Sequence, residues 1–230
     1  MADPFYGSEA LGVASRVRET LARWLFPVAC LGCGRQLAGR EPLHLCIACR
    51  ARLRPAGPIG PLAAPTDLRI LSLWRYEPPL DAVILALKFR RLDYLGRHLA
   101  RELAAGLGRE LREADLVVPV PLHWTRRVAR GFDQAERIAV PLAEGLRLPV
   151  VRALTRRWAT RAQTRLGRTA RRANLAGAFR IGDSRAVAGR RILLVDDVTT
   201  TGATLEAAAA VLRAAGAAEV LGLTAARTPL

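Results

Sequence analysis

The stretch that decides the fold is Ile192-Leu-Leu-Val-Asp-Asp-Val-Thr-Thr-Thr-Gly-Ala-Thr204. An apolar run, typical of a buried strand, ends in two adjacent carboxylates, Asp196 and Asp197. A turn of threonines and glycine follows, and an alanine-rich helical pattern then runs from Ala203 to Ala215. Such a turn and helix start aim backbone N–H groups at one point, which suits a phosphate. Acids at the carboxyl end of a strand suit sugar hydroxyls. The stretch therefore predicts a site for a phosphorylated sugar.

The candidate residues of this site divide by role. Asp196 and Asp197 would act in catalysis by holding ribose hydroxyls. The residues that would hold the phosphate are Thr199, Thr200, Thr201, Gly202, Ala203 and Thr204. The alternative is an ordinary strand–helix turn that is rich in threonine. Adjacent acids on a buried strand are costly without a partner, and this favours the binding site.

The stretch resembles the phosphoribosyl pyrophosphate (PRPP) signature of type I phosphoribosyltransferases. That signature has four apolar residues, two acids, an apolar residue and then Thr-x-Thr-Gly-x-Thr/Ser, and this chain matches every position. It is not a Walker A loop, because no Gly-Lys-Ser/Thr is present.

Strand and helix patterns alternate along residues 66–230. Strand patterns cover Ile70–Tyr76, Asp115–Pro121, Arg191–Val195 and Glu219–Thr224. Helical patterns cover Asp81–Phe89, Gly96–Gly106 and Asp133–Leu146, the last with a kink expected at Pro141. The alternation predicts an α/β fold with a mainly parallel sheet. With the signature above, we expect the type I phosphoribosyltransferase fold.

The amino-terminal part carries four cysteines as two Cys-x2-Cys pairs: Cys30, Cys33, Cys46 and Cys49. Two such pairs complete a closed, all-cysteine tetrahedral site, so we expect a structural zinc ribbon. Disulfides or idle core thiols are the alternatives. Residues 15–26 show helical spacing, and residues 55–65 hold four prolines and two glycines, which is typical of a linker. We therefore expect a zinc module over residues 1–60 and a second domain over residues 66–230.

The chain has a formal net charge of +16, and residues 145–182 contain ten arginines and no acid. Such a field attracts polyanions, either PRPP or nucleic acid, although a solvated basic face is the alternative. The sequence has no run of 18 uncharged apolar residues and no pattern of a signal peptide, so we expect a cytoplasmic protein without membrane insertion.

Two further segments and one lysine are candidates for ligand binding. The strand that ends in Val118-Pro-Val-Pro121 leads into a loop whose Leu122 and His123 would offer N–H groups to pyrophosphate. The basic segment around Arg161 and Arg165 suits a lid over a polyphosphate. Lys88 is the only lysine among 36 basic residues, which indicates either a need for a compact ammonium or a chance codon.

Taken together, the motifs resemble the ComF family, also called ComF/GntX. The matching features are the cysteine pairs, Tyr76, Lys88-Phe89, Val118–His123, Arg130–Gln134, Gln163–Asn174 and the PRPP signature, with Asp133 where asparagine is usual. The resemblance implies binding of PRPP with Mg²⁺ and a link to DNA uptake in natural competence. It also implies single-stranded DNA and an ATP-driven competence protein as partners.

The sequence leaves three functions open: an active phosphoribosyltransferase in small-molecule metabolism, a factor that handles single-stranded DNA, and a PRPP-sensing regulator without catalysis. Trp124 and Trp158 would stack bases in the second function. We favour buried core positions for both tryptophans.

Overall fold

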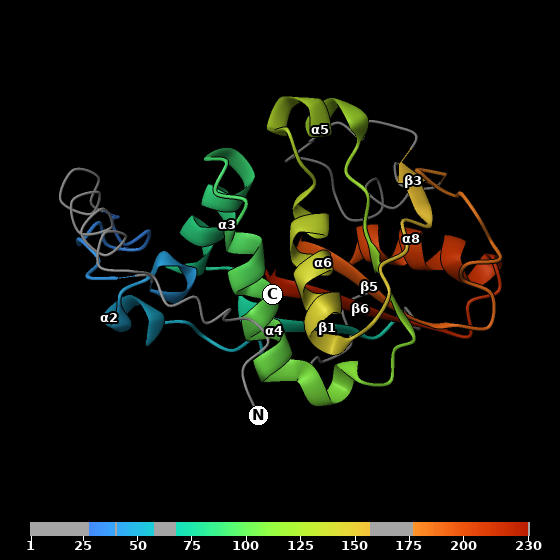
Figure 1. Cartoon of the computed structure of the whole chain (residues 1–230), viewed down its shortest axis with the longest axis horizontal. Coiled ribbons are helices and arrows are strands. Elements are labelled where there is room, and N and C mark those ends of the chain that lie inside the picture. Colours follow the sequence, from blue (N-terminus) through green and yellow to red (C-terminus); the bar gives the residue numbers. More distant parts are fainter. Residues whose placement is uncertain (1–27, 40, 58–67, 157–176, 230) are drawn as a thin grey trace, which may run out of the picture.

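A four-stranded parallel sheet forms the centre of the computed structural model, which describes residues 28–39, 41–57, 68–156 and 177–229 (Figure 1). The strand order is β1 (Ile70–Arg75), β6 (Glu219–Arg227), β5 (Arg191–Thr199) and β2 (Leu116–Pro119). The strands are apolar because both faces of the sheet are covered. The predicted α/β class with a parallel sheet is confirmed.

Helices cover both faces of the sheet, as alternate residues of β5 show. Leu193 and Val195 join the core formed with α3 (Leu80–Phe89), α4 (Leu95–Leu111) and α6 (Gln134–Leu146). Ile192 and Leu194 join the core formed with α8 (Ala203–Ala214). In Figure 1, α4 and α6 stand in front of the sheet and α8 lies behind it. Within the described residues, no helix combines the length and the hydrophobicity needed to cross a bilayer.

Within the sheet domain, three of the described elements were not predicted from the sequence. The short helix α5 (Trp124–Arg130) follows β2, where we expected a loop. The strands β3 (Leu154–Arg156) and β4 (Phe179–Ile181) form an antiparallel pair that flanks residues 157–176. Helix α6 was predicted within one residue, and it continues through Pro141.

The cysteine module packs directly on the sheet domain. It contains the 3-10 helix η1 (Pro42–His44) and the short helix α2 (Ile47–Arg50). Its Leu43 and Leu45 are fully buried in the same core as Leu99 and Leu103 of α4. The helix expected over residues 15–26 lies outside the described residues, and the proposed boundary between residues 60 and 66 stays a prediction.

Polar contacts reinforce the junction between the module and the sheet domain. The Arg50 guanidinium lies 2.6 Å from a carboxylate oxygen of Glu102, and the Leu43 N–H donates to His98 Nδ1 at 3.1 Å. The Ala56 N–H donates to the Leu73 carbonyl at 3.0 Å, so the segment after the module lies against β1.

Candidate sugar-phosphate site and cysteine cluster

The acid pair lies on β5 just beyond the point where its pairing with β2 ends. Pairing with β2 ends at Pro119 and Val195, whereas pairing with β6 continues from Asp196 to Thr199. Asp196 is therefore the first residue of β5 without a neighbour in β2. The polar residues sit at the carboxyl end of the parallel strands, where open α/β sheets bind ligands.

Lys88, at the end of α3, forms an ion pair with the second acid. Its Nζ lies 2.9 Å from Asp197 Oδ2, and the side chains are only 20% and 10% exposed. Asp197 projects from the sheet face that α3 covers, because it alternates with Leu193 and Val195 of that core. The structure therefore brings Lys88 together with the acid pair, which lies in a distant part of the sequence.

The two acids are too close together to ionise independently. Burial, and then the charge of Asp197, raise the pKa of Asp196 to about 7, and the ammonium of Lys88 opposes this rise. The Asp197 N–H donates to Asp196 Oδ1 at 2.8 Å. Near neutral pH the site can hold one proton on Asp196 and an ion pair at Asp197.

The turn after the acids leads straight into α8. Gly202 has φ of 80°, a left-handed conformation that favours glycine, and the Ala203 N–H donates to Thr201 Oγ1 at 3.4 Å. Thr199 is buried, Thr200 is exposed, and Thr201 and Thr204 are partly exposed. The positive end of the α8 dipole therefore follows the acid pair and this turn, and binding of a phosphate there stays a prediction.

The loop before α5 differs from the expectation in one respect. The Leu122 N–H already donates to Asp133 Oδ2 at 2.6 Å, so in this conformation it offers no free donor to pyrophosphate. His123 is buried, and its Nδ1 lies 2.8 Å from Thr125 Oγ1. A role of this loop in binding pyrophosphate stays a prediction.

Asp133 has a structural role that the sequence analysis missed. One oxygen caps α6 by accepting from the Ala135 N–H at 3.0 Å, and the other fixes Leu122. An asparagine has a single carbonyl oxygen for these two donors. Burial raises the pKa of Asp133, although these N–H groups oppose the rise. The capping signature, an acid just before a helical pattern, could have indicated this role.

Gln134 is a second residue whose role the sequence analysis did not assign. It is 2% exposed, and its Oε1 accepts from Arg130 Nη1 at 2.8 Å. Its Nε2 is buried and has no hydrogen-bond partner among the described residues. A buried amide donor of this kind is free to meet a ligand oxygen.

The four cysteines of the amino-terminal module form one cluster. The sulfurs of Cys30, Cys33, Cys46 and Cys49 all lie within 4.8 Å of one another. Burial opposes ionisation of Cys30, but N–H groups, among them that of Cys46 at 3.3 Å, outweigh it and lower the pKa to about 6. Burial and the neighbouring thiols raise the pKa of Cys49 to about 12. Such crowded sulfurs can bind a metal ion such as zinc, which favours the thiolate forms.

Arg161, Arg165 and Trp158 lie outside the described residues. Trp124 is described, and the expectation that it belongs to the core is wrong, because it is 66% exposed.

Comparison with known proteins identifies the family. Residues 94–227 match the family model of the phosphoribosyl transferase domain. The chain is 35% identical over 200 residues to the DNA utilization protein YhgH of Salmonella typhimurium, covering 83% of this chain and 86% of that protein. It is 32% identical over 159 residues to competence protein F of Haemophilus influenzae, covering 66% and 69% of the two chains.

A solved structure titled glutamine PRPP amidotransferase from B. subtilis, complexed with ADP and GMP, aligns with 57% of this chain and 25% of its own. The sequence identity is 27% and the TM-score is 0.37, too low for a fold comparison to carry weight. The family-model match and the two relatives suffice: the chain belongs to the phosphoribosyl transferase domain family and, within it, to the ComF family of DNA utilization and competence proteins.

Proposed function

We propose that the acid pair and the turn before α8 bind PRPP together with Mg²⁺. The observation that carries this proposal is the order of groups at the open edge of β5: two adjacent acids, of which Asp197 is buried and paired with Lys88, followed by the turn and the start of α8. Membership of the phosphoribosyl transferase domain family supports a phosphorylated ribose as the ligand.

Each part of the site suits one part of PRPP. The turn and the α8 dipole suit the 5′-phosphate. Asp196 and Asp197 suit the ribose hydroxyls, because carboxylate oxygens accept hydrogen bonds from them. Mg²⁺ would come with PRPP and neutralise its pyrophosphate. The ammonium of Lys88 offsets part of the negative charge of the pair and limits its repulsion of an anionic ligand.

We also propose that the protein acts in DNA utilization and handles single-stranded DNA. The names of its relatives support this role, and so does the stretch of ten arginines without an acid between residues 145 and 182. The alternatives are an active phosphoribosyltransferase of small-molecule metabolism, which transfers the phosphoribosyl group to a nitrogen nucleophile, and a PRPP-sensing regulator without catalysis.

For the cysteine cluster we infer one structural zinc. The four thiolates would fill a tetrahedral shell and leave no open position for catalysis. The metal would then stabilise the module and take no part in the chemistry at β5.

Calorimetry with PRPP and Mg²⁺ tests the sugar site. The double variant Asp196→Asn, Asp197→Asn should lose detectable binding, because neutral amides cannot replace two carboxylates, while circular dichroism stays unchanged. Asp183→Asn removes an exposed acid and serves as the matched control. Absence of PRPP binding to the unmutated protein, or unchanged binding to the double variant, would overturn the proposal.

A competition experiment separates the two parts of the proposal. PRPP and a single-stranded oligonucleotide are titrated against the same preparation, alone and together. Competition indicates that the sugar site and the DNA share a surface, whereas independent binding indicates separate sites.

A further inference from the structure

Two helices on one side of the molecule expose apolar side chains in pairs. The pairs are Leu85 and Phe89 on α3, and Trp124 and Val128 on α5. Members of each pair are four residues apart and so share one helix face. Phe89, Trp124 and Val128 are 64%, 66% and 75% exposed. Single exposed apolar side chains are common, whereas a group of them on neighbouring helices is typical of an interaction site.

The two exposed aromatic rings are each braced by a neighbour. The Arg130 guanidinium lies 4.8 Å from the centroid of the Phe89 ring, and Arg130 is itself hydrogen-bonded to Gln134. The Trp124 ring lies 5.8 Å from that of the buried His123, tilted by 41°. A ring that is held in place and still exposed can stack on another flat group with little loss of side-chain entropy.

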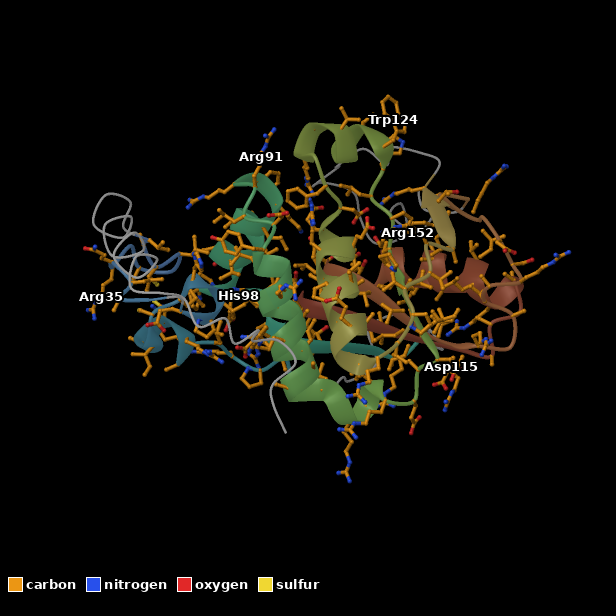
Figure 2. The ribbon with its side chains drawn as sticks, in the orientation of Figure 1. Arg35, Arg91, His98, Asp115, Trp124 and Arg152 are labelled. Carbon is orange, nitrogen blue, oxygen red and sulfur yellow. The ribbon has the colours of Figure 1, made fainter. Side chains whose placement is uncertain are left out.

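The stretches that carry these side chains are basic, and acids occur only at their borders, at Asp81 and Asp93 for the first and at Asp115 and Asp133 for the second. Residues 82–92 hold Lys88, Arg90 and Arg91 without an aspartate or glutamate, and residues 116–132 hold three arginines without one. Arg90 and Arg91 are exposed. In Figure 2, Arg91 and Trp124 both point outward on the same side of the molecule. We call Phe89, Arg90, Arg91, Trp124, Val128 and Arg130 the aromatic rim.

The aromatic rim adjoins the candidate sugar-phosphate site. Phe89 directly follows Lys88, whose ammonium contacts Asp197. Trp124 follows the loop in which Asp133 holds Leu122. The Arg130 contact with Phe89 joins the α3 and α5 sides of the rim.

We infer that the aromatic rim binds single-stranded DNA, with bases stacked on Phe89 and Trp124 and phosphates beside the arginines. Exposed aromatic rings interleaved with arginines, and no acids in either segment, match a strand that carries bases and negative charge. An apolar protein partner would use the aliphatic side chains but gain nothing from the acid-free basic flanks. This inference rests on the proposed role in DNA handling and assigns that role to a surface.

The test measures binding of a fluorescent oligothymidylate by anisotropy over a range of salt concentrations. Phe89→Ala and Trp124→Ala should each raise Kd by about 5- to 100-fold, the equivalent of about 1–3 kcal/mol for one stacked base. The slope of log Kd against log salt should stay unchanged, because no phosphate contact is removed. Trp124→Phe should restore most of the affinity.

Heparin and a remote variant provide the controls. Heparin carries negative charge but no bases, so both alanine variants should bind it as the unmutated protein does. Ile47→Ala removes an 86% exposed apolar side chain from α2, in the cysteine module, and should leave DNA binding unchanged.

Unchanged DNA affinity in both alanine variants would overturn the inference and would favour a protein partner for the exposed apolar side chains of α3 and α5. Equal losses for heparin and DNA would also overturn it, because they would indicate loss of structure or charge. If the unmutated protein binds no single-stranded DNA, both this inference and the proposed DNA role are wrong. PRPP calorimetry on the same preparation then tests the sugar-phosphate site independently.

Discussion

Replacement of Lys88 by methionine removes the ammonium that pairs with Asp197 and keeps the length of the side chain. Loss of one partner from a buried ion pair costs about 3–5 kcal/mol. The two side chains are 20% and 10% exposed, so we expect the lower end, about 3 kcal/mol at pH 8. Urea unfolding followed by tryptophan fluorescence, with zinc present throughout, measures the free energy of unfolding.

The loss should depend on pH. The pKa of Asp196 is raised to about 7 in the folded protein, above its ordinary value of 3.8, so its contribution to stability is full below about pH 4 and is lost as the pH rises through 7. Without Lys88 the acid pair keeps a proton to higher pH. The difference between Lys88→Met and the unmutated protein should therefore shrink by at least half at pH 5.5.

Arg90→Met, which removes an exposed cation two residues away, should change stability by less than about 0.5 kcal/mol. A loss of stability below about 1 kcal/mol at pH 8 for Lys88→Met would refute the reasoning, because it would show that the ion pair contributes little to folding. A loss of equal size at both pH values would also refute it, because the contribution of the pair would then not depend on protonation of the acids.

Three further predictions concern the metal, the basic segment and the shared core. Cys46→Ser should lower the zinc content from near one per chain to near zero, and retention of zinc by a double variant that also carries Cys30→Ser would contradict the site. Replacement of Arg161, Arg165 and Arg168 by glutamine should flatten the salt dependence of DNA binding by about 0.7 per lost phosphate contact, and an unchanged slope would mean that the segment is only a solvated face. Leu43→Ala should cost about 2–5 kcal/mol in the unfolding of the whole chain, and a separate early transition of the module alone would contradict a shared core.

The sheet and the acid pair were predictable because their signals are local. The apolar run of β5, the acids at its end and the turn before α8 are contiguous in the sequence. The contact between Lys88 and Asp197 was not predictable in the same way, because it depends on how α3 packs against the sheet. The presence of a single lysine indicated a specific role for its ammonium group, but the sequence did not show which acid it would contact.

The errors at the loop after β2 also have physical causes. The Val118-Pro-Val-Pro121 sequence favours an irregular chain, and the seven-residue α5 is too short to show a clear period. The occupied N–H of Leu122 depends on a carboxylate eleven residues later. Trp124 was expected to be buried because large aromatic side chains usually are, and nothing in its immediate neighbours indicates that it lies on an open helix face.

The packing of Leu43 and Leu45 against α4 bears on how the protein can be divided for experiments. A truncated chain that starts at residue 66 would expose the α4 leucines that these side chains cover, and would leave the Leu73 carbonyl without the Ala56 N–H. Because the cysteine cluster and α4 share one core, a metal that binds only the folded module would stabilise the entire chain by mass action. Chelation of such a metal would then lower the melting temperature of the phosphoribosyltransferase domain itself, although the candidate sugar-phosphate site contains none of the cysteines.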